Sequence, residues 1–391
     1  MGSHAPAGSG TFPPHMRIGV PKETAAGEHR VALVPEVVTK LSGRGLDVVV
    51  QEGAGAAALL PDQEFADAGA GIAATGEEVW GCEIVVVISP PQPAQIQALG
   101  AGSILIGFLA PLTSPATTRA LADAGATALA MEAIPRISRA QSMDALSSQS
   151  NVSGYKAALL GAEEIGRFYP MLMTAAGTIP PAKVLVLGVG VAGLQALATA
   201  KRLGARTTGY DVRPEVAEQV ASLGAQWLDL GLEASGEGGY ARELTDEERA
   251  RQQQALTDAI KGFDVVITTA LVPGRPAPEL VTQEAVEGMK PGSVVVDLAG
   301  EAGGNCALTE PGETVIRHDV KIVAPLNLPS TMAEHSSQLF ARNVLALLEL
   351  LIDESGQLAL DFDDEVVAGA CIVREGEIVH AGARATVEAA A

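Results

Sequence analysis

The sequence has 391 residues, of which 47% are hydrophobic and 19% are charged. Its 26 lysines and arginines stand against 47 aspartates and glutamates, so the formal net charge is −21 at pH 7. Proteins that bind nucleic acid, or that are held on anionic lipid by charge, usually carry the opposite sign, so both classes are disfavoured. A phosphate-bearing ligand would have to be bound locally, by backbone N–H groups or the end of a helix.

The length predicts two or three domains, and the 43 glycines and 3% aromatic residues suit an α/β protein with small side chains between helices and sheet. Three well-separated cysteines, Cys82, Cys306 and Cys371, argue against a disulfide framework or a CxxC metal site, and we expect no metal. The best apolar segment, Ala341–Ile352, is short and carries charged side chains, so we expect no membrane-spanning helix.

Residues 1–15 are rich in Gly, Ser, Pro and His and precede a second methionine, Met16. They lack the apolar core of a signal peptide and the basic pattern of a transit peptide. We interpret them as a tag remnant or a disordered leader, which leaves the cytoplasm as the expected location.

Short runs rich in Val and Ile alternate with helical segments in the first third of the chain, which is typical of a parallel sheet covered on both faces. The helical segments include Pro35–Gly43 and Pro115–Ala124. The predicted strands are Arg17–Val20, Asp47–Gln51, Glu83–Ser89, Ser103–Leu109 and Thr127–Ala130.

A polar stretch, Arg136–Asn151, interrupts this alternation and precedes a helix predicted from Gly154 to about Ala175. A helix over about Thr331–Ile352 and a hairpin, Ala370–Val373 with Ile378–His380, are predicted at the end. Between them, the alternation restarts with strands at Lys183–Leu187, Thr207–Tyr210, Asp264–Thr268, Ser293–Leu298 and Lys321–Ala324.

Two separate runs of parallel strands predict an α/β fold of two doubly wound, Rossmann-like domains with a cleft between them. We expect a first domain of residues 16–145 that regains residues 331–391, and a second domain of residues 146–330 that binds NAD.

The second run contains a dinucleotide-binding motif, Gly188-Val-Gly190-Val-Ala-Gly193, directly after a strand and before the Ala-rich helix Leu194–Leu203. Asp211 ends the next strand, 23 residues after Gly188. Its carboxylate would accept hydrogen bonds from the adenosine ribose and repel a 2′-phosphate, which favours NAD over NADP. Arg213 is a mild signal in the other direction.

A similar glycine pattern, Gly53-Ala-Gly55-Ala-Ala-Ala58, also follows a strand. No acidic residue ends a second strand about 20 residues later, where residues 69–74 lie. We therefore expect close backbone packing there and place the nucleotide site in the second domain.

The polar stretch has two readings that composition alone leaves open. It contains side chains able to bind an amide, a ribose or a carboxylate, but a solvated linker would have the same composition. Loops between doubly wound domains are where ligand clefts form, which favours a site. The side chains concerned are Arg136, Arg139, Gln141, Asp144, Ser147 and Gln149.

Distinctive segments run through the chain: RISRAQSMDALSSQSN, GYKAA, MLMTAAGTIPPAKVLVLGVGVAGLQA, ATAKRLGA, DVRPEV, TTALVPGRPAP, MKPGSVVVDLAGEAGGNC and EPGETVI. Together they resemble domain I of the proton-translocating nicotinamide nucleotide transhydrogenase, its soluble NAD(H)-binding alpha component. The resemblance implies direct hydride transfer between NADH here and NADP⁺ on a partner domain III, coupled to proton translocation by membrane domain II. It also implies a homodimer, held on the cytoplasmic face of the inner membrane through its partner subunits.

The resemblance also implies roles for individual residues. Arg136, Asp144 and Ser147 would orient the nicotinamide carboxamide and its ribose, and Gln141 would reach toward the NADP(H) of the partner. Tyr240 matches the tip of a loop that closes over bound nucleotide. The full expected set of cofactor-binding residues is Ile137, Ser138, Arg139, Ser142, Met143, Gly188, Val189, Gly190, Val191, Gly193, Asp211, Val212, Arg213, Gly239, Tyr240, Gln252 and Leu271.

Alanine dehydrogenase, a relative with the same N-terminal RIGVPKE…HRVAL pattern, is the main alternative. Its substrate-binding lysine would fall in Ile84–Pro91 and its histidine at the end of Ile104–Ala110, and this chain has neither residue there. Its aspartate before a Gly-Gly pair corresponds to Glu301. Amino-acid oxidation therefore lacks a cation for the carboxylate and a proton donor.

A non-catalytic NAD-sensing module is a further alternative. Sensing requires affinity for the cofactor but no exposed cluster that grips an amide, so the polar stretch disfavours it. Three isolated histidines, His318, His335 and His380, are expected to be structural or exposed rather than catalytic.

Overall fold

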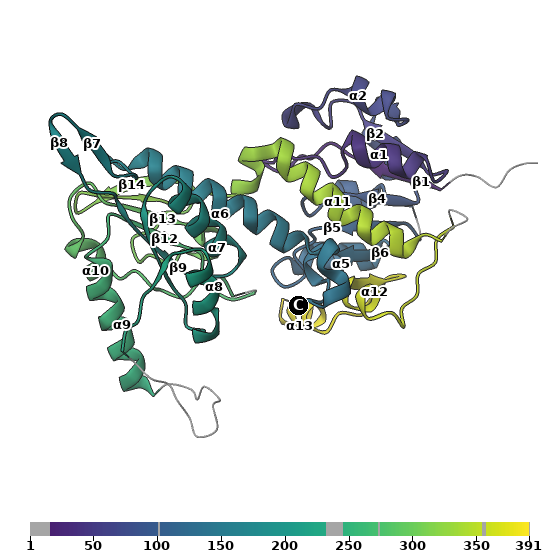
Figure 1. The fold of residues 1–391 in the computed structure, drawn as a ribbon. Helices are drawn as coiled ribbons and strands as arrows, with labels where there is room; N and C mark the ends of the chain where they lie inside the picture. Colours follow the sequence, from purple (N-terminus) through teal and green to yellow (C-terminus); the bar gives the residue numbers. More distant parts are fainter. Residues whose placement is uncertain (1–15, 101, 232–244, 273, 354–356, 391) are drawn as a thin grey trace, which may run out of the picture. The chain divides into compact units, whose positions relative to one another are not determined.

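The computed structural model describes residues 16–100, 102–231, 245–272, 274–353 and 357–390. The chain forms two compact units, shown in Figure 1. Unit 1 comprises the chain up to residue 145 together with residues 333–391, and unit 2 comprises residues 146–332. Unit 2 is thus one continuous segment inserted between the two segments of unit 1.

Unit 1 is built on an eight-stranded sheet in the order β17-β16-β6-β5-β4-β1-β2-β3. The strands from β3 to β6 run parallel, whereas β16 and β17 are antiparallel additions at the β6 edge. The bounds are β1 Arg17–Val20, β2 Asp47–Gln51, β3 Gly71–Ala73, β4 Ile84–Val86, β5 Ile104–Gly107, β6 Thr127–Ala130, β16 Cys371–Arg374 and β17 Glu377–Ile378.

Helices cover both faces of this sheet because successive strand residues point to opposite sides. Ile104 and Ile106 pack into one hydrophobic cluster, while Leu105 between them packs into the other. The first cluster includes residues of α1 (Pro35–Ser42), α2 (Asp62–Asp67), α11 (Ala333–Leu351) and α12 (Glu365–Ala370). The second includes residues of α3 (Gly76–Trp80), α4 (Pro93–Gln97) and α5 (Pro115–Asp123), and α13 (Ala381–Ala389) lies beside α5.

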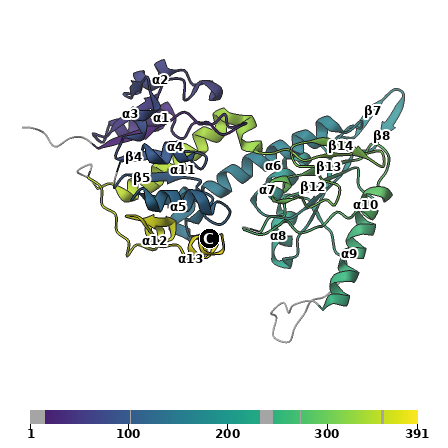
Figure 2. The same ribbon diagram turned by 180° about the vertical axis from the view of Figure 1, so that it is seen from behind.

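Unit 2 has a seven-stranded sheet in the order β11-β10-β9-β12-β13-β15-β14, with only β14 antiparallel to its neighbour. The bounds are β9 Lys183–Leu187, β10 Arg206–Tyr210, β11 Gln226–Trp227, β12 Val265–Thr268, β13 Val294–Asp297, β14 Thr314–Arg317 and β15 Val320–Val323. One face packs on α6 (Ala145–Glu164), α7 (Val191–Arg202) and α8 (Ala217–Ser222). The other face packs on α9 (Asp246–Ile260) and α10 (Gln283–Gly288), seen from behind in Figure 2.

The two sheets share one feature that matters for ligand binding. In each, the first strand lies at the centre, with the second and third strands on one side and the fourth on the other. Chains wound in this way leave a crevice at the carboxyl ends of the two central strands, where ligands of such sheets bind. The doubly wound α/β architecture predicted from the sequence is therefore confirmed.

The polar stretch differs from its prediction. It is not an open loop but a 3₁₀ turn, η3 (Ser138–Met143), followed by α6, which begins at Ala145 and ends at Glu164 instead of running from Gly154 to about Ala175. Ser, Gln and Asn weaken a helix only slightly, and buried alanines of α6 such as Ala157 anchor it on the sheet. The segment predicted as its second half forms an antiparallel hairpin, β7 (Leu172–Thr174) with β8 (Gly177–Ile179).

Short elements were also missed. The strands β3, β11 and β14 contain only two to four residues each and carry too little periodicity to be recognised. The remaining 3₁₀ turns are η1 Ala56–Ala58, η2 Met131–Ala133, η4 Pro214–Val216, η5 Gly300–Ala302 and η6 Leu328–Met332. Within the described ranges, no helix combines the length and apolar character that crossing a membrane requires.

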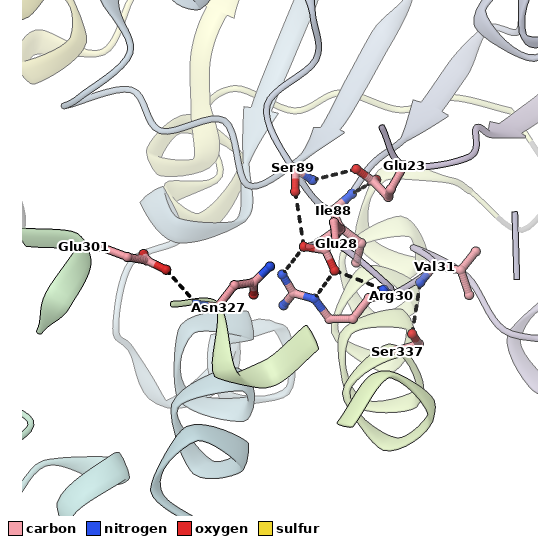
Figure 3. Close-up of polar contacts among 9 residues, drawn as sticks. All are labelled: Glu23, Glu28, Arg30, Val31, Ile88, Ser89, Glu301, Asn327 and Ser337. Carbon is pink, nitrogen blue, oxygen red and sulfur yellow. Dashed lines mark hydrogen bonds and ion pairs between the residues drawn. The ribbon is translucent and has the colours of Figure 1, made fainter. Parts of the chain in front are cut away.

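The crevice of the unit 1 sheet is filled by charged side chains (Figure 3). Glu23 follows β1, and its carboxylate accepts hydrogen bonds from the backbone N–H groups of Ile88 at 2.5 Å and Ser89 at 3.3 Å, just after β4. Beside it, Glu28 and Arg30 form a buried ion pair with N–O distances of 2.6 and 2.7 Å. The Ser89 hydroxyl donates to Glu28 at 3.3 Å and links the two groups.

Two carboxylates and one guanidinium in a buried cluster favour the retention of a proton. Burial, and then the negative charge of Glu28, raise the pKa of Glu23 to about 7, although the backbone hydrogen bonds and Arg30 act in the opposite direction. The folded chain therefore holds a proton on Glu23 that the unfolded chain has lost. Linkage then makes the free energy of unfolding of unit 1 fall as the pH rises from about 4.5 to about 7.

Replacement of Glu23 by glutamine, which has the shape of the protonated acid, should remove this component of the pH dependence. We expect E23Q to be more stable than the parent protein by roughly 1–3 kcal/mol at about pH 8 and nearly equal to it at about pH 5. Urea unfolding in a Trp227→Phe background, followed by the fluorescence of Trp80 in α3, reports on unit 1. Glu52→Gln, at an exposed position, is the matched control. Equal effects of E23Q at both pH values would contradict the assignment.

Candidate functional site

The glycine-rich turn of unit 2 lies at the carboxyl end of the central strand β9. Gly188 has a φ of +87°, a conformation that side chains disfavour. A Cβ at Gly193 would lie 2.0 Å from the carbonyl oxygen of Gly188, so helix α7 approaches the turn too closely for any other residue. The Thr269 hydroxyl donates to the Gly188 carbonyl at 2.8 Å and ties the turn to the end of β12. The turn is thus fixed from both sides of the crevice.

The N-terminus of α7 has the properties of a phosphate site. Gly190 is its N-cap residue, and no side chain of the described residues caps the helix. A Cβ at Gly190 would meet no described heavy atom within 4 Å, so there is open space in front of the first turn. The first N–H groups of a helix lack intrahelical partners and carry partial positive charge. A pyrophosphate could be held here by backbone alone, as the acidic composition requires.

Asp211 follows β10 and faces the glycine turn. Its Oδ2 accepts from the Val189 N–H at 2.8 Å, and its Oδ1 accepts from the Arg213 N–H at 3.0 Å. The Arg213 guanidinium contacts both oxygens at 3.0 Å. Burial acts to raise the pKa of Asp211, but the hydrogen bonds from Arg213 and Val189 outweigh it and hold the pKa below its usual range. The carboxylate is therefore ionised at neutral pH, as a ribose acceptor should be.

Two further expected contacts lie near the end of β10 or in the loop after β12. The Gln252 amide donates to the Tyr210 hydroxyl at 2.9 Å, and the Tyr210 ring stacks on Trp227 with centroids 6.4 Å apart. Leu271 is 54% exposed, which leaves its side chain accessible to a ligand. Both residues belong to unit 2 with the glycine turn.

A buried brace that the sequence analysis missed holds the loop carrying Leu271. The fully buried Asn305 side chain accepts from the Ala270 N–H at 3.1 Å and donates to the carbonyls of Ala270 and Pro278. Asp297 is also fully buried and accepts five hydrogen bonds, from the hydroxyls of Thr268 and Thr309 and the N–H groups of Ala299, Asn305 and Cys306. The segment MKPGSVVVDLAGEAGGNC contains both residues, but nothing in it indicated this role.

The residues of the polar stretch divide between the units. Positions 136–144 belong to unit 1, where Arg136 and Gln141 are exposed on or beside η3, whereas Ser147 belongs to unit 2, on α6. Arg139 has a structural engagement, because its guanidinium binds Asp364 at 2.7 and 2.9 Å. Its contribution to cofactor binding stays a prediction, as do those of the exposed Ser138 and Ser142, the half-buried Ile137 and Asp144, and the buried Met143.

Two expected residues, Gly239 and Tyr240, lie outside the described residues. Val212 is 71% exposed and Val191 40% exposed, so both side chains flank the turn at the surface. Across the described ranges, no group of three His, Cys, Asp or Glu side chains is placed to hold a metal ion.

Comparison with known proteins places this geometry in a family. Residues 19–153 match the family model "Alanine dehydrogenase/PNT, N-terminal domain", and residues 157–381 match the corresponding C-terminal domain. The chain is 49% identical over 376 residues to the first of the alpha-subunit polypeptides of the NAD(P) transhydrogenase of Rhodospirillum rubrum, covering 93% of this chain and 98% of that protein.

A solved transhydrogenase structure from Sinorhizobium meliloti is 43% identical, with a TM-score of 0.84, over 93% of this chain and 100% of that one. The alanine dehydrogenase of Halomonas elongata is 32% identical, over 96% of each chain. The resemblance inferred from the motifs is thereby confirmed. The chain belongs to the alanine dehydrogenase/PNT family, in which it is more similar to these transhydrogenases than to this alanine dehydrogenase.

Proposed function

We propose that this chain is the NAD(H)-binding component of a proton-translocating transhydrogenase. It would pass a hydride directly between its own NADH and NADP⁺ on a partner domain, while a membrane component couples the transfer to proton movement. The observation that carries the proposal is the glycine turn of unit 2 with its open helix end and ionised Asp211, in a chain 49% identical to a transhydrogenase alpha subunit.

The chemistry asks the protein to position and exclude, without a nucleophile or a metal. NADH supplies the hydride. Hydride transfer is fast when donor and acceptor carbons are held in near contact and water is kept out. The backbone of Val189–Val191 would bind the pyrophosphate, and Asp211 the adenosine ribose. Arg136, Asp144 and Ser147 would hold the carboxamide and ribose of the nicotinamide half, and Gln141 would face the partner's nucleotide.

The assembly belongs to the same proposal. A homodimer would present this site to the NADP(H)-binding domain III, and attachment to the cytoplasmic face of the inner membrane would come through the partner subunits. With a formal charge of −21, docking would depend on complementary protein surfaces, since anionic lipid repels the chain.

Alanine dehydrogenation is the less favoured function. Where that enzyme would place a lysine, Ile88 and Ser89 instead donate backbone N–H groups to Glu23. Where it would place a histidine, Ala110 donates its N–H to Glu132. Glu301 accepts from the Asn327 N–H at 2.9 Å (Figure 3). These positions hold backbone, and none offers a cation for a keto-acid carboxylate.

Mixing the purified chain with a transhydrogenase domain III preparation tests the proposal directly. With NADPH on domain III and an oxidised NAD⁺ analogue on this chain, we expect rapid reduction of the analogue, followed by its absorbance. No transfer while both nucleotides are bound would favour a non-catalytic NAD sensor. An alanine-dependent production of NADH by the chain alone would favour amino-acid oxidation.

Gln141→Asn should separate transfer from binding. Because the side chain is proposed to face the partner's nucleotide, shortening it should lower the transfer rate strongly, by about ten- to a hundredfold. The NADH affinity, measured by fluorescence titration, should change little. Gln97→Asn, at an exposed position of α4, is the matched control. Loss of NADH binding in Gln141→Asn would contradict the proposed orientation.

Asp211→Ala should weaken NADH binding by roughly 1.5–3 kcal/mol, the scale of a charge-assisted hydrogen bond. The variant also removes the acceptor of the Val189 N–H, so the change bears on the turn as well as on the ribose. Calorimetric titration gives the affinity. Asp258→Ala controls for the loss of a carboxylate paired with a cation, since Asp258 binds Lys261 at 2.9 Å. Unchanged affinity in Asp211→Ala would refute the ribose assignment.

A further inference from the structure

We propose that Arg213 is a masked 2′-phosphate-binding residue, and that its pairing with Asp211 sets the choice of NAD(H) over NADP(H). The inference rests on the proposed function in one respect, that the glycine turn binds a dinucleotide. It changes the role of Arg213, which the sequence presented only as a mild signal against Asp211.

The first step is the saturation of the Asp211 carboxylate. An ionised carboxylate offers about four lone-pair positions. The described contacts are also four: the Val189 N–H, the Arg213 N–H, and the Nε and Nη2 groups of Arg213, at 2.8 to 3.0 Å. A ribose hydroxyl can therefore bond to this carboxylate only by displacing one of these donors.

The second step identifies which donor can leave. Two of the four are backbone groups, fixed by the glycine turn and by the start of η4 at Pro214. The other two belong to the Arg213 side chain, which is 53% exposed, whereas the Asp211 side chain is 7% exposed. The guanidinium is thus the movable partner, and binding of a ribose diol would exchange it for the two hydroxyls.

The third step concerns the 2′-phosphate. An arginine near the end of this strand is the group that accommodates a 2′-phosphate in NADP-binding sites of this fold. A guanidinium has five N–H donors, and Arg213 uses two of them on Asp211. The residue therefore has both the position and the donors for a phosphate. The negative charge of Asp211 keeps it engaged and would repel the phosphate directly.

Neutralising the mask should therefore expose the phosphate site. Asp211→Asn retains an oxygen for the Val189 N–H, so the turn keeps its conformation, but it removes the charge that holds Arg213. The probes are 5′-AMP and adenosine 2′,5′-bisphosphate, which differ only in the 2′-phosphate and need no nicotinamide contacts. We expect Asp211→Asn to bind the bisphosphate about ten- to a hundredfold more tightly than the parent protein does.

The double variant Asp211→Asn/Arg213→Gln decides whether Arg213 is the receptor. It should lose the gain in bisphosphate affinity, whereas Asp211→Asn/Arg206→Gln should keep it. Arg206 is an exposed arginine at the opposite end of the same strand, β10, and controls for general charge. Asp211→Ser, which also removes the negative charge, guards against a local distortion specific to asparagine.

The outcomes separate this inference from the proposed function. A gain that survives in the Arg213→Gln double variant, or no gain in either single Asp211 variant, would overturn the inference. If the parent protein binds NADH yet supports no hydride transfer with domain III, only the proposed function fails. If it binds neither NADH nor 5′-AMP, both fail together.

Discussion

The reversal of winding at the centre of each parallel sheet is the constraint on which the rest of the structure depends. Both faces of such a sheet are buried under helices, so polar groups collect at the carboxyl ends of the strands. The central strands are β1 with β4 in unit 1 and β9 with β12 in unit 2. Each pair supports a different set of polar groups at the same topological position.

The contrast between these two positions shows why only one suits a nucleotide. In unit 2 the chain leaves β9 through glycines and presents backbone N–H groups at the start of α7. In unit 1 the corresponding position holds Glu23 and the buried Glu28–Arg30 pair. Removing such an ion pair from water costs several kcal/mol per ion, which the cluster offsets through its hydrogen bonds. A phosphate would meet carboxylates there, and electrostatics directs it to the other sheet.

Sequence reasoning reached what depends on local pattern and missed what depends on distant partners. The buried strands were recognised because Val and Ile recur in short runs, and the Gly188 turn because its spacing fixes its geometry. The helix α6 was misplaced because its stability comes from packing on a sheet, which its polar composition hides. The saturation of Asp211 depends on a side-chain orientation of Arg213. The brace from Asn305 to Ala270 joins residues 35 positions apart, so it has no local signature.

The insertion of unit 2 within unit 1 has a consequence for the order of folding during synthesis. Unit 2 can complete its sheet as soon as residue 332 has left the ribosome, because all its strands lie in one segment. The N-terminal segment of unit 1 is synthesised earlier, yet it waits for α11 to cover its sheet and for β16 to pair with β6. Until then the edge of β6 and the apolar face under α11 are exposed, which makes the nascent N-terminal segment a natural client for chaperones.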